Sequence, residues 1–119
     1  MKTRVLSLSA NPELGKLRAM VLRHAGYDVV WSPTRKEAEQ LIRDQDFDVL
    51  LIGHSISGDT ARELAEAFRG GNPKGKVIAI TASAYIMVRT DKTVRAIDGP
   101  EALLEAIEEV LESPPTSGG

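Results

Sequence analysis

A chain of 119 residues with 42% hydrophobic content is long enough to bury one core, so we expect one domain over residues 1–112 and a disordered tail over residues 113–119. The absence of cysteine excludes disulfides and thiolate metal sites, and no apolar run approaches the roughly 20 residues that cross a bilayer, so we expect a cytoplasmic protein. The formal net charge of −2, with Lys and Arg scattered among acids, gives no concentrated positive patch and argues against nucleic acid as a partner.

A short apolar run and a capping pair mark the first strand and helix. Residues 5–8 form a mostly apolar run of strand length. Asn11 can accept a hydrogen bond from a free backbone N–H, and Pro12 fits the first helical turn, so a helix begins here. Gly26 is the expected left-handed terminator. Helical spacing predicts an inward stripe of large apolar side chains: Leu14, Leu17, Met20 and Val21.

Two further strands follow at residues 27–31 and 48–52, and each leads into a helix. The second of these runs is almost continuously apolar, as expected when helices cover both faces of a parallel sheet. Each helix is predicted to open with a capping box, in which two side chains satisfy end donors: Thr34 with Glu37, and Thr60 with Glu63. The inward-facing side chains of the two helices are predicted to be Ala38, Leu41, Ile42, Leu64, Ala67 and Phe68.

The last part of the chain contains two more predicted strands, at residues 77–80 and 93–97. Residues 82–91 between them lack clear periodicity, and we expect a short or irregular helix there. Asp98-Gly99-Pro100 marks another helix start. The inward stripe of this final helix is predicted to be Leu103, Leu104, Ile107, Val110 and Leu111.

Five strands that alternate with helices predict a doubly wound α/β domain with a parallel sheet and right-handed crossovers. Such sheets bind ligands at the carboxyl ends of their strands, near the point where strand order reverses. The residues at these ends are Ser9, Ala10 and Asn11 after the first strand, Gly53 and His54 after the third, Thr81 after the fourth and Ala96 after the fifth.

Over residues 3–112 the chain resembles the receiver domains of response regulators. The resemblance rests on several short matches in the right order: Asn11-Pro12, Ala25-Gly26-Tyr27, Asp46-Phe47-Asp48, Ser57-Gly58, residues 77–82 and residues 98–104. It implies a flavodoxin-like sheet with strand order 2-1-3-4-5 and helices on both faces. Residues 81–96 look shorter than the corresponding part of receivers by roughly two helical turns, which puts their usual output surface in doubt.

The resemblance also implies a degenerate phosphorylation site. A receiver transfers a phosphoryl group to its own aspartate, aided by an acidic pair that holds Mg²⁺, a hydroxyl and a lysine. Here Gly53 takes the place of the phosphoacceptor, while Ser9 and Ala10 take the places of the acidic pair. Thr81 retains the hydroxyl, and Ala96 takes the place of the lysine. Since glycine cannot accept a phosphoryl group, we expect a pseudo-receiver with no enzymatic activity, no metal and no cofactor.

Two functions from different classes follow. The first is phosphorylation-independent binding of a protein partner in two-component signalling, either a kinase or effector or a second copy of the chain in a homodimer. The alternative is a flavodoxin-like domain that binds an anionic ligand or a flavin phosphate at the first helix, through Ser7, Ser9 and Asn11. The candidate ligand-binding residues across both hypotheses are Asn11, His54 and Thr81.

Two other features have competing interpretations. The lone Trp31, at a strand end, is expected to pack in the domain, although it could stack on a flat ligand or anchor a partner. Arg35 and Lys36 lie in the first turn of a predicted helix, where cations are unfavourable relative to the helix dipole. Solvated surface is the simpler interpretation of this pair, and a contact with another molecule is the other.

Overall fold

A computed structural model describes residues 3–53, 56–81 and 90–112. The described part contains five strands, four α-helices and one short 3₁₀ helix. In chain order these are β1 (Arg4–Leu8), α1 (Pro12–His24), β2 (Asp28–Ser32), α2 (Arg35–Asp44), β3 (Val49–Ile52), α3 (Gly58–Gly71), β4 (Lys76–Thr81), β5 (Lys92–Arg95), η1 (Ala96–Asp98) and α4 (Gly99–Glu112). The expected tail at 113–119 and most of the irregular segment predicted at 82–91 lie outside the described residues.

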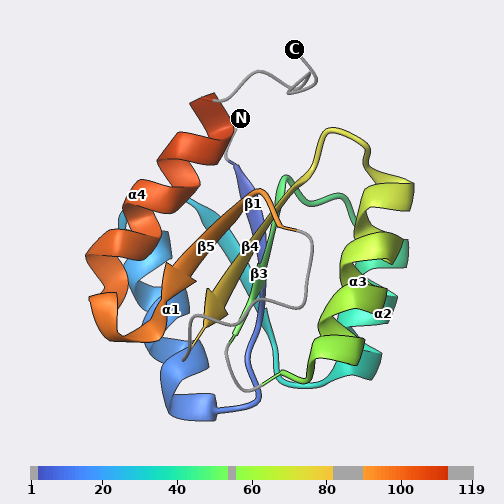
Figure 1. The fold of residues 1–119 in the computed structure, drawn as a ribbon, viewed down its shortest axis with the longest axis horizontal. Helices are drawn as coiled ribbons and strands as arrows, with labels where there is room; N and C mark the ends of the chain where they lie inside the picture. Colours follow the sequence, from blue (N-terminus) through green and yellow to red (C-terminus); the bar gives the residue numbers. More distant parts are fainter. Residues whose placement is uncertain (1–2, 54–55, 82–89, 113–119) are drawn as a thin grey trace.

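The five strands form one parallel sheet in the order β2-β1-β3-β4-β5, which confirms the predicted doubly wound fold. Figure 1 shows α1 and α4 on one face of the sheet and α2 and α3 on the other. All strands run the same way, so their carboxyl ends meet at one edge. Over the described ranges, none of the helices has both the length and the apolar character needed to cross a bilayer.

Alternation along the strands divides the interior into two cores. On β1, Val5 packs in the core beneath α1 and α4, whereas Leu6 packs in the core beneath α2 and α3. The central strand β3 repeats the pattern with Leu51 on the first side and Leu50 on the second. Successive side chains of a strand point to opposite faces, and both faces are covered by helices. The nearly continuous apolar runs in the sequence follow from this double burial.

α1 turns a different set of side chains toward the sheet from the predicted stripe. Leu17 is 44% exposed and Met20 is 60% exposed, so the prediction is wrong at both positions. The helix instead buries Gly15, Ala19 and Leu22. The reason is the indole of Trp31 on β2, whose Nε1 lies 2.3 Å from the position that a Cβ on Gly15 would take. Only a residue without a side chain leaves room for that ring.

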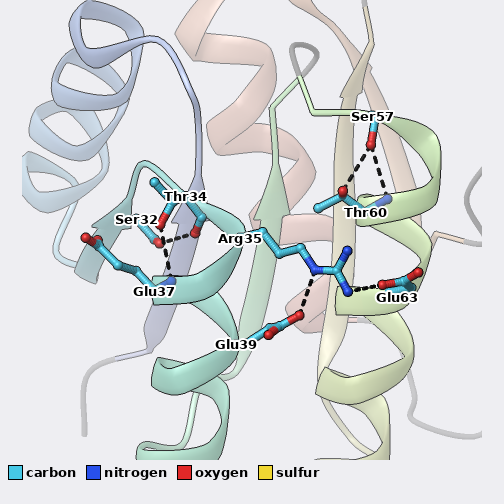
Figure 2. A network of polar contacts seen from close by, with 8 residues as sticks. All are labelled: Ser32, Thr34, Arg35, Glu37, Glu39, Ser57, Thr60 and Glu63. Carbon is cyan, nitrogen blue, oxygen red and sulfur yellow. Dashed lines mark hydrogen bonds and ion pairs between the residues drawn. The ribbon is translucent and has the colours of Figure 1, made fainter.

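α3 begins before the predicted capping box. The hydroxyl of Ser57 accepts a hydrogen bond from the backbone N–H of Thr60 at 3.3 Å, which makes Ser57 the N-cap (Figure 2). Thr60 therefore lies in the first turn, and the predicted box of Thr60 with Glu63 is wrong. The hydroxyl of Ser57, three residues before Thr60, already accepts from a free backbone N–H of the first turn. The helix buries Ala61, Leu64, Ala65 and Phe68, and the predicted inward position Ala67 is exposed.

Arg35 joins α2 to α3 through two carboxylates. Its Nε donates to Oε1 of Glu39 at 2.7 Å, and its Nη2 is paired with the carboxylate of Glu63 on α3 (Figure 2). Thr34 caps α2 as predicted, accepting from the backbone N–H of Glu37 at 3.2 Å. The two carboxylates compensate for the unfavourable position of Arg35 at a helix start, so an interaction role is not needed to explain this cation.

β5 ends earlier than predicted. The strand expected over 93–97 stops at Arg95, and Ala96 begins the short helix η1. The guanidinium of Arg95 binds both carboxylate oxygens of Asp98, at 3.1 and 3.0 Å, across a single turn. Residues three apart eclipse one another in a 3₁₀ helix, which suits this pair. The final helix then starts at Gly99 as predicted, although Leu111 of its predicted stripe is 39% exposed.

Asp91 secures the return of the chain from β4 to β5. Its Oδ2 accepts the backbone N–H of Val77 at 2.7 Å and lies 3.3 Å from Nη2 of Arg69 on α3. Because Val77 is fully buried, loss of this acceptor would leave a buried donor without a partner.

We therefore expect Asp91→Ala to lower the free energy of unfolding by about 1–3 kcal/mol in urea titrations. Amide hydrogen exchange at Val77 should accelerate in the same variant. Asp91→Asn keeps an acceptor oxygen and serves as the control, with a smaller loss. Unchanged protection of the Val77 amide in the alanine variant would contradict this role.

Candidate functional site

The carboxyl ends of β1 and β3 bring two of the predicted positions together. The backbone N–H of Gly53 donates to the carbonyl of Leu8 at 2.8 Å, and the Cα of Ser9 lies 3.6 Å from where a Cβ on Gly53 would be. Thr81 ends the neighbouring strand β4 and is half-buried, and Ala96 follows β5 in η1 and is also half-buried. The predicted residues thus lie along one edge of the sheet.

Gly53 is tightly enclosed by backbone. A Cβ at this position would lie 3.0 Å from the carbonyl oxygen of Leu8 and 3.2 Å from Nη1 of Arg18. The first neighbour belongs to a strand and cannot easily move aside. A side chain at residue 53 would require these neighbours to shift by a few tenths of an ångström.

Ser9 and Ala10 offer no charge at this edge. Ser9 is buried, with its hydroxyl donating to the carbonyl of Asn11 at 3.3 Å, and its backbone N–H donates to the carbonyl of Ser32 at 3.1 Å. Ala10 is exposed and has only a methyl group. Mg²⁺ prefers carboxylate ligands, and neither Ser9 nor Ala10 supplies one at this edge.

The helix start that the ligand-binding alternative requires is already capped. Oδ1 of Asn11 accepts from the backbone N–H groups of Glu13 and Leu14, at 3.0 and 3.2 Å. Ser7 is buried inside β1, at 1% exposure. These residues therefore present few free donors to a flavin phosphate. His54, the other candidate ligand-binding residue, lies outside the described residues.

Arg18 is a site residue that the sequence interpretation missed. Its side chain extends from α1 to the strand ends, with Nη1 beside the Gly53 position. Partial burial lowers the pKa of its guanidinium, which nonetheless stays charged at neutral pH. In the described part of the chain, no carboxylate or carbonyl pairs with this group. The sequence feature that could have identified Arg18 is its spacing. It follows Leu14 by one helical turn and therefore lies on the same side of α1, nearest the strand ends.

Trp31 packs within the domain, against α1 and the loop that carries Ser9. Its indole N–H donates to the carbonyl of Ser9 at 3.0 Å, while the ring covers Gly15 of α1. The packing interpretation of this residue therefore fits the structure, and the ring is half-buried. Through this bond, β2 and α1 fix the backbone of the loop that carries Ser9.

The electrostatics of this edge follow from these contacts. Over the described ranges, no cluster of three or more His, Cys, Asp or Glu side chains is arranged to hold a metal ion. The charged group beside Gly53 is a guanidinium, which repels a divalent cation and attracts an anion. The charge beside Gly53 therefore favours a negative group over a divalent cation at this position.

Comparison with known proteins finds the fold in solved structures. No protein-family model and no curated protein matches the chain. A CheY-like response regulator receiver domain protein from Methanospirillum hungatei is 22% identical, with a TM-score of 0.81 over 100% of both chains. The chemotaxis response regulator CheY4 of Vibrio cholerae is 19% identical, with a TM-score of 0.82 over 92% of this chain and 99% of that one. The response regulator TrrA of Thermotoga maritima, solved with Mg²⁺ and BeF, is 20% identical, with a TM-score of 0.77 and the same coverage.

These similarities establish the architecture. The chain has the CheY-like, flavodoxin-type fold over its whole described length, with the strand order that the family resemblance implied.

Proposed function

We propose that this chain is an atypical receiver-like domain that acts in signal transduction by binding another protein without being phosphorylated. The observation that carries the proposal is the environment of Gly53, which has no side chain and lies against the Leu8 carbonyl and the Arg18 guanidinium. Ser9 and Ala10 supply no acidic pair beside it. The fold is retained and the charge of its strand-end site is reversed, so the domain's output cannot depend on an acyl phosphate at this position.

An exposed apolar face on α1 supports binding of a protein partner. Leu17 and Met20 are 44% and 60% exposed, lie one turn apart, and belong to the same side of the helix. Large apolar side chains that gather on one exposed face often mark an interaction surface. The partner class that fits the fold is a signalling kinase or effector, and a second copy of the chain would use the same face in a homodimer.

The direct test of the proposal uses phosphoryl analogues. Beryllofluoride with Mg²⁺, followed by ¹H–¹⁵N NMR of the 119-residue chain, should produce no saturable shifts at Gly53 or Thr81. Acetyl phosphate with Mg²⁺ should add no phosphoryl mass. Saturable shifts confined to the strand ends would overturn the proposal, because they would require a metal and phosphoryl site that the residues do not supply.

Restoring the acceptor alone should not restore the chemistry. We expect Gly53→Asp to gain no phosphoryl group from acetyl phosphate, as measured by intact-mass spectrometry, because Ser9 and Ala10 still hold no Mg²⁺. The variant should also lose about 1–3 kcal/mol of stability, since a Cβ at this position meets the Leu8 carbonyl. Gly53→Ala is the control that separates the steric effect from the charge. Stoichiometric labelling of Gly53→Asp would show that the rest of the receiver machinery is present.

Partner binding can be tested at the exposed face. Met20→Glu should weaken binding of a cognate kinase or effector, or dissociate a homodimer, by about tenfold or more, because it places a charge in an apolar contact. Leu111→Glu, which changes an exposed apolar residue on α4, is the matched control and should bind normally. The measured affinity should be the same with and without acetyl phosphate, and a phosphodonor-dependent affinity would contradict the proposed mechanism.

A further inference from the structure

A small cavity lies between α1 and α4 at the carboxyl ends of β4 and β5. Its volume is about 130 Å³, and its apolar walls include Leu14 and Leu17 from α1, Ile80 from β4 and Leu103 from α4. Figure 1 shows α1 and α4 side by side on this face of the sheet, with the ends of β4 and β5 near the start of α1. The cavity is thus adjacent to the strand-end site and shares Arg18 and Ala96 with it.

Two arginines belong to the walls of this cavity, and they differ in their surroundings. Arg95 is held by Asp98 through two hydrogen bonds, so its charge is already compensated. Arg18 reaches from the same cavity toward Gly53 and is half-buried. No partner for its guanidinium is found in the part of the chain that the structure describes. No Asp or Glu belongs to the cavity walls.

A half-buried, unpaired cation is costly, because it has lost part of its hydration without gaining a counter-charge. An anion that reached Arg18 would recover that loss. Guanidinium presents a planar fork of N–H donors that matches the two oxygens of a carboxylate. The neighbouring walls are apolar, so the rest of such an anion would be buried among aliphatic side chains.

We propose that the cavity between α1 and α4 binds a small monocarboxylate, with its carboxylate on the Arg18 guanidinium and its apolar body between the two helices. The volume sets the size of that body, because an apolar cavity of about 150 Å³ is known to admit benzene. The fitting class is therefore an aromatic or branched aliphatic acid with a body of about six carbons. This site goes beyond the proposed function, and it differs from the flavin-phosphate alternative because it uses Arg18 in place of Ser7, Ser9 and Asn11.

A phosphate is a poorer match than a carboxylate. A doubly charged phosphate group has three terminal oxygens to satisfy, and the cavity offers a single uncompensated guanidinium among apolar walls. A protein carboxylate, such as a chain end, has the right head group, but its polar peptide backbone would lie against apolar walls. A free small acid satisfies both the charge and the volume.

The test is an NMR titration of the full chain with benzoate and cyclohexanecarboxylate. Each should give saturable shifts at Ala96, Gly99 and the Arg18 Nε–H, with dissociation constants in the millimolar range or tighter. Benzyl alcohol lacks the charge and acetate lacks the body, so both should bind at least about tenfold more weakly. Inorganic phosphate should not displace benzoate at equal concentration.

Arg18→Gln should weaken benzoate binding by about tenfold or more, because it removes a charge-assisted pair. Lys16→Gln removes an exposed cation from the same helix and is the matched control, with unchanged affinity. If Arg18→Gln fails to fold, Ala96→Leu provides a second test, since it fills the cavity from η1 and leaves Arg18 in place. That variant should also lose benzoate binding.

Several results would overturn the proposal. These are the absence of saturable shifts with either acid, equal benzoate affinity in Arg18→Gln and the parent, and displacement of benzoate by phosphate. Binding of peptides through their C-terminal carboxylate, without binding of the free acids, would reject the small-molecule site in favour of a peptide site. The beryllofluoride experiment is independent of all these results, so failure of this site would leave the proposed function untouched.

Discussion

Replacing Gly15 with valine should lower the free energy of unfolding by about 3 kcal/mol, because α1 lies directly against the indole of Trp31. A Cβ at residue 15 would lie 2.3 Å from Nε1 and 2.6 Å from Cε2 of that ring, well inside contact distance. The ring cannot turn away without breaking its hydrogen bond to the Ser9 carbonyl. The substitution therefore forces α1 off the sheet or removes a buried polar contact.

Urea unfolding followed by tryptophan fluorescence measures this effect, since Trp31 is the only tryptophan in the chain. The native emission should also shift to the red in Gly15→Val, because the indole is pushed toward solvent. Gly70→Ala is the matched control within another helix, where nothing lies within 4 Å of the added Cβ. It should raise stability by about 0.5–1 kcal/mol through the lower helix propensity of glycine. Equal stabilities of Gly15→Val and the parent would show that Trp31 does not occupy this position.

Truncation of Phe68 should have a comparable or larger effect, about 3–5 kcal/mol for Phe68→Ala. Phe68 is 2% exposed and lies in the core beneath α2 and α3, close to the turn that leads into β4. Its ring lies 2.5 Å from where a Cβ on Gly75 would be, so the turn is shaped around it. Asn72, between the two, donates to the carbonyl of Phe47 at 2.7 Å.

Loss of the ring would leave a cavity in the core and release the entry to β4. Thermal and urea unfolding measure the change, and hydrogen exchange at the start of β4 should accelerate in parallel. Met20→Ala provides the contrast, because this side chain is 60% exposed and its removal should change stability by less than about 1 kcal/mol. A similar small loss for Phe68→Ala would mean that the turn does not depend on the ring.

The charge beside Gly53 connects the structural findings to the proposed function. Carboxylates at this edge would attract a divalent metal, whereas the guanidinium of Arg18 beside Gly53 attracts an anion. The same guanidinium also lines the apolar cavity between α1 and α4. Under the proposed function, a bound carboxylate would take the place of phosphorylation as the signal. Leu17, which is exposed and also lines the cavity, would connect that ligand to the face of α1.

Local chemistry in the sequence determined the order and type of most elements. Asn11 and Pro12 started the first helix and Gly26, with a φ of +102°, ended it, as expected from their intrinsic preferences. The strands were found to within about one residue except at β5. Gly53 was identified as unable to accept a phosphoryl group from its residue type alone. These features depend on a residue and its near neighbours along the chain, which a sequence contains in full.

Tertiary structure decided which face of α1 is buried, where β5 ends, and what lies beside Gly53. The side of α1 that faces the sheet is set by the Trp31 ring on β2. Only Gly15 leaves room for that ring, so Gly15 is buried while Leu17 and Met20 are exposed. The position of Arg18 depends on the strand ends that it reaches. Spacing along a helix shows which of its residues lie on the same side. It does not show the shape and charge of the neighbouring elements that this side contacts, because those elements are distant in the sequence and meet only in the folded chain.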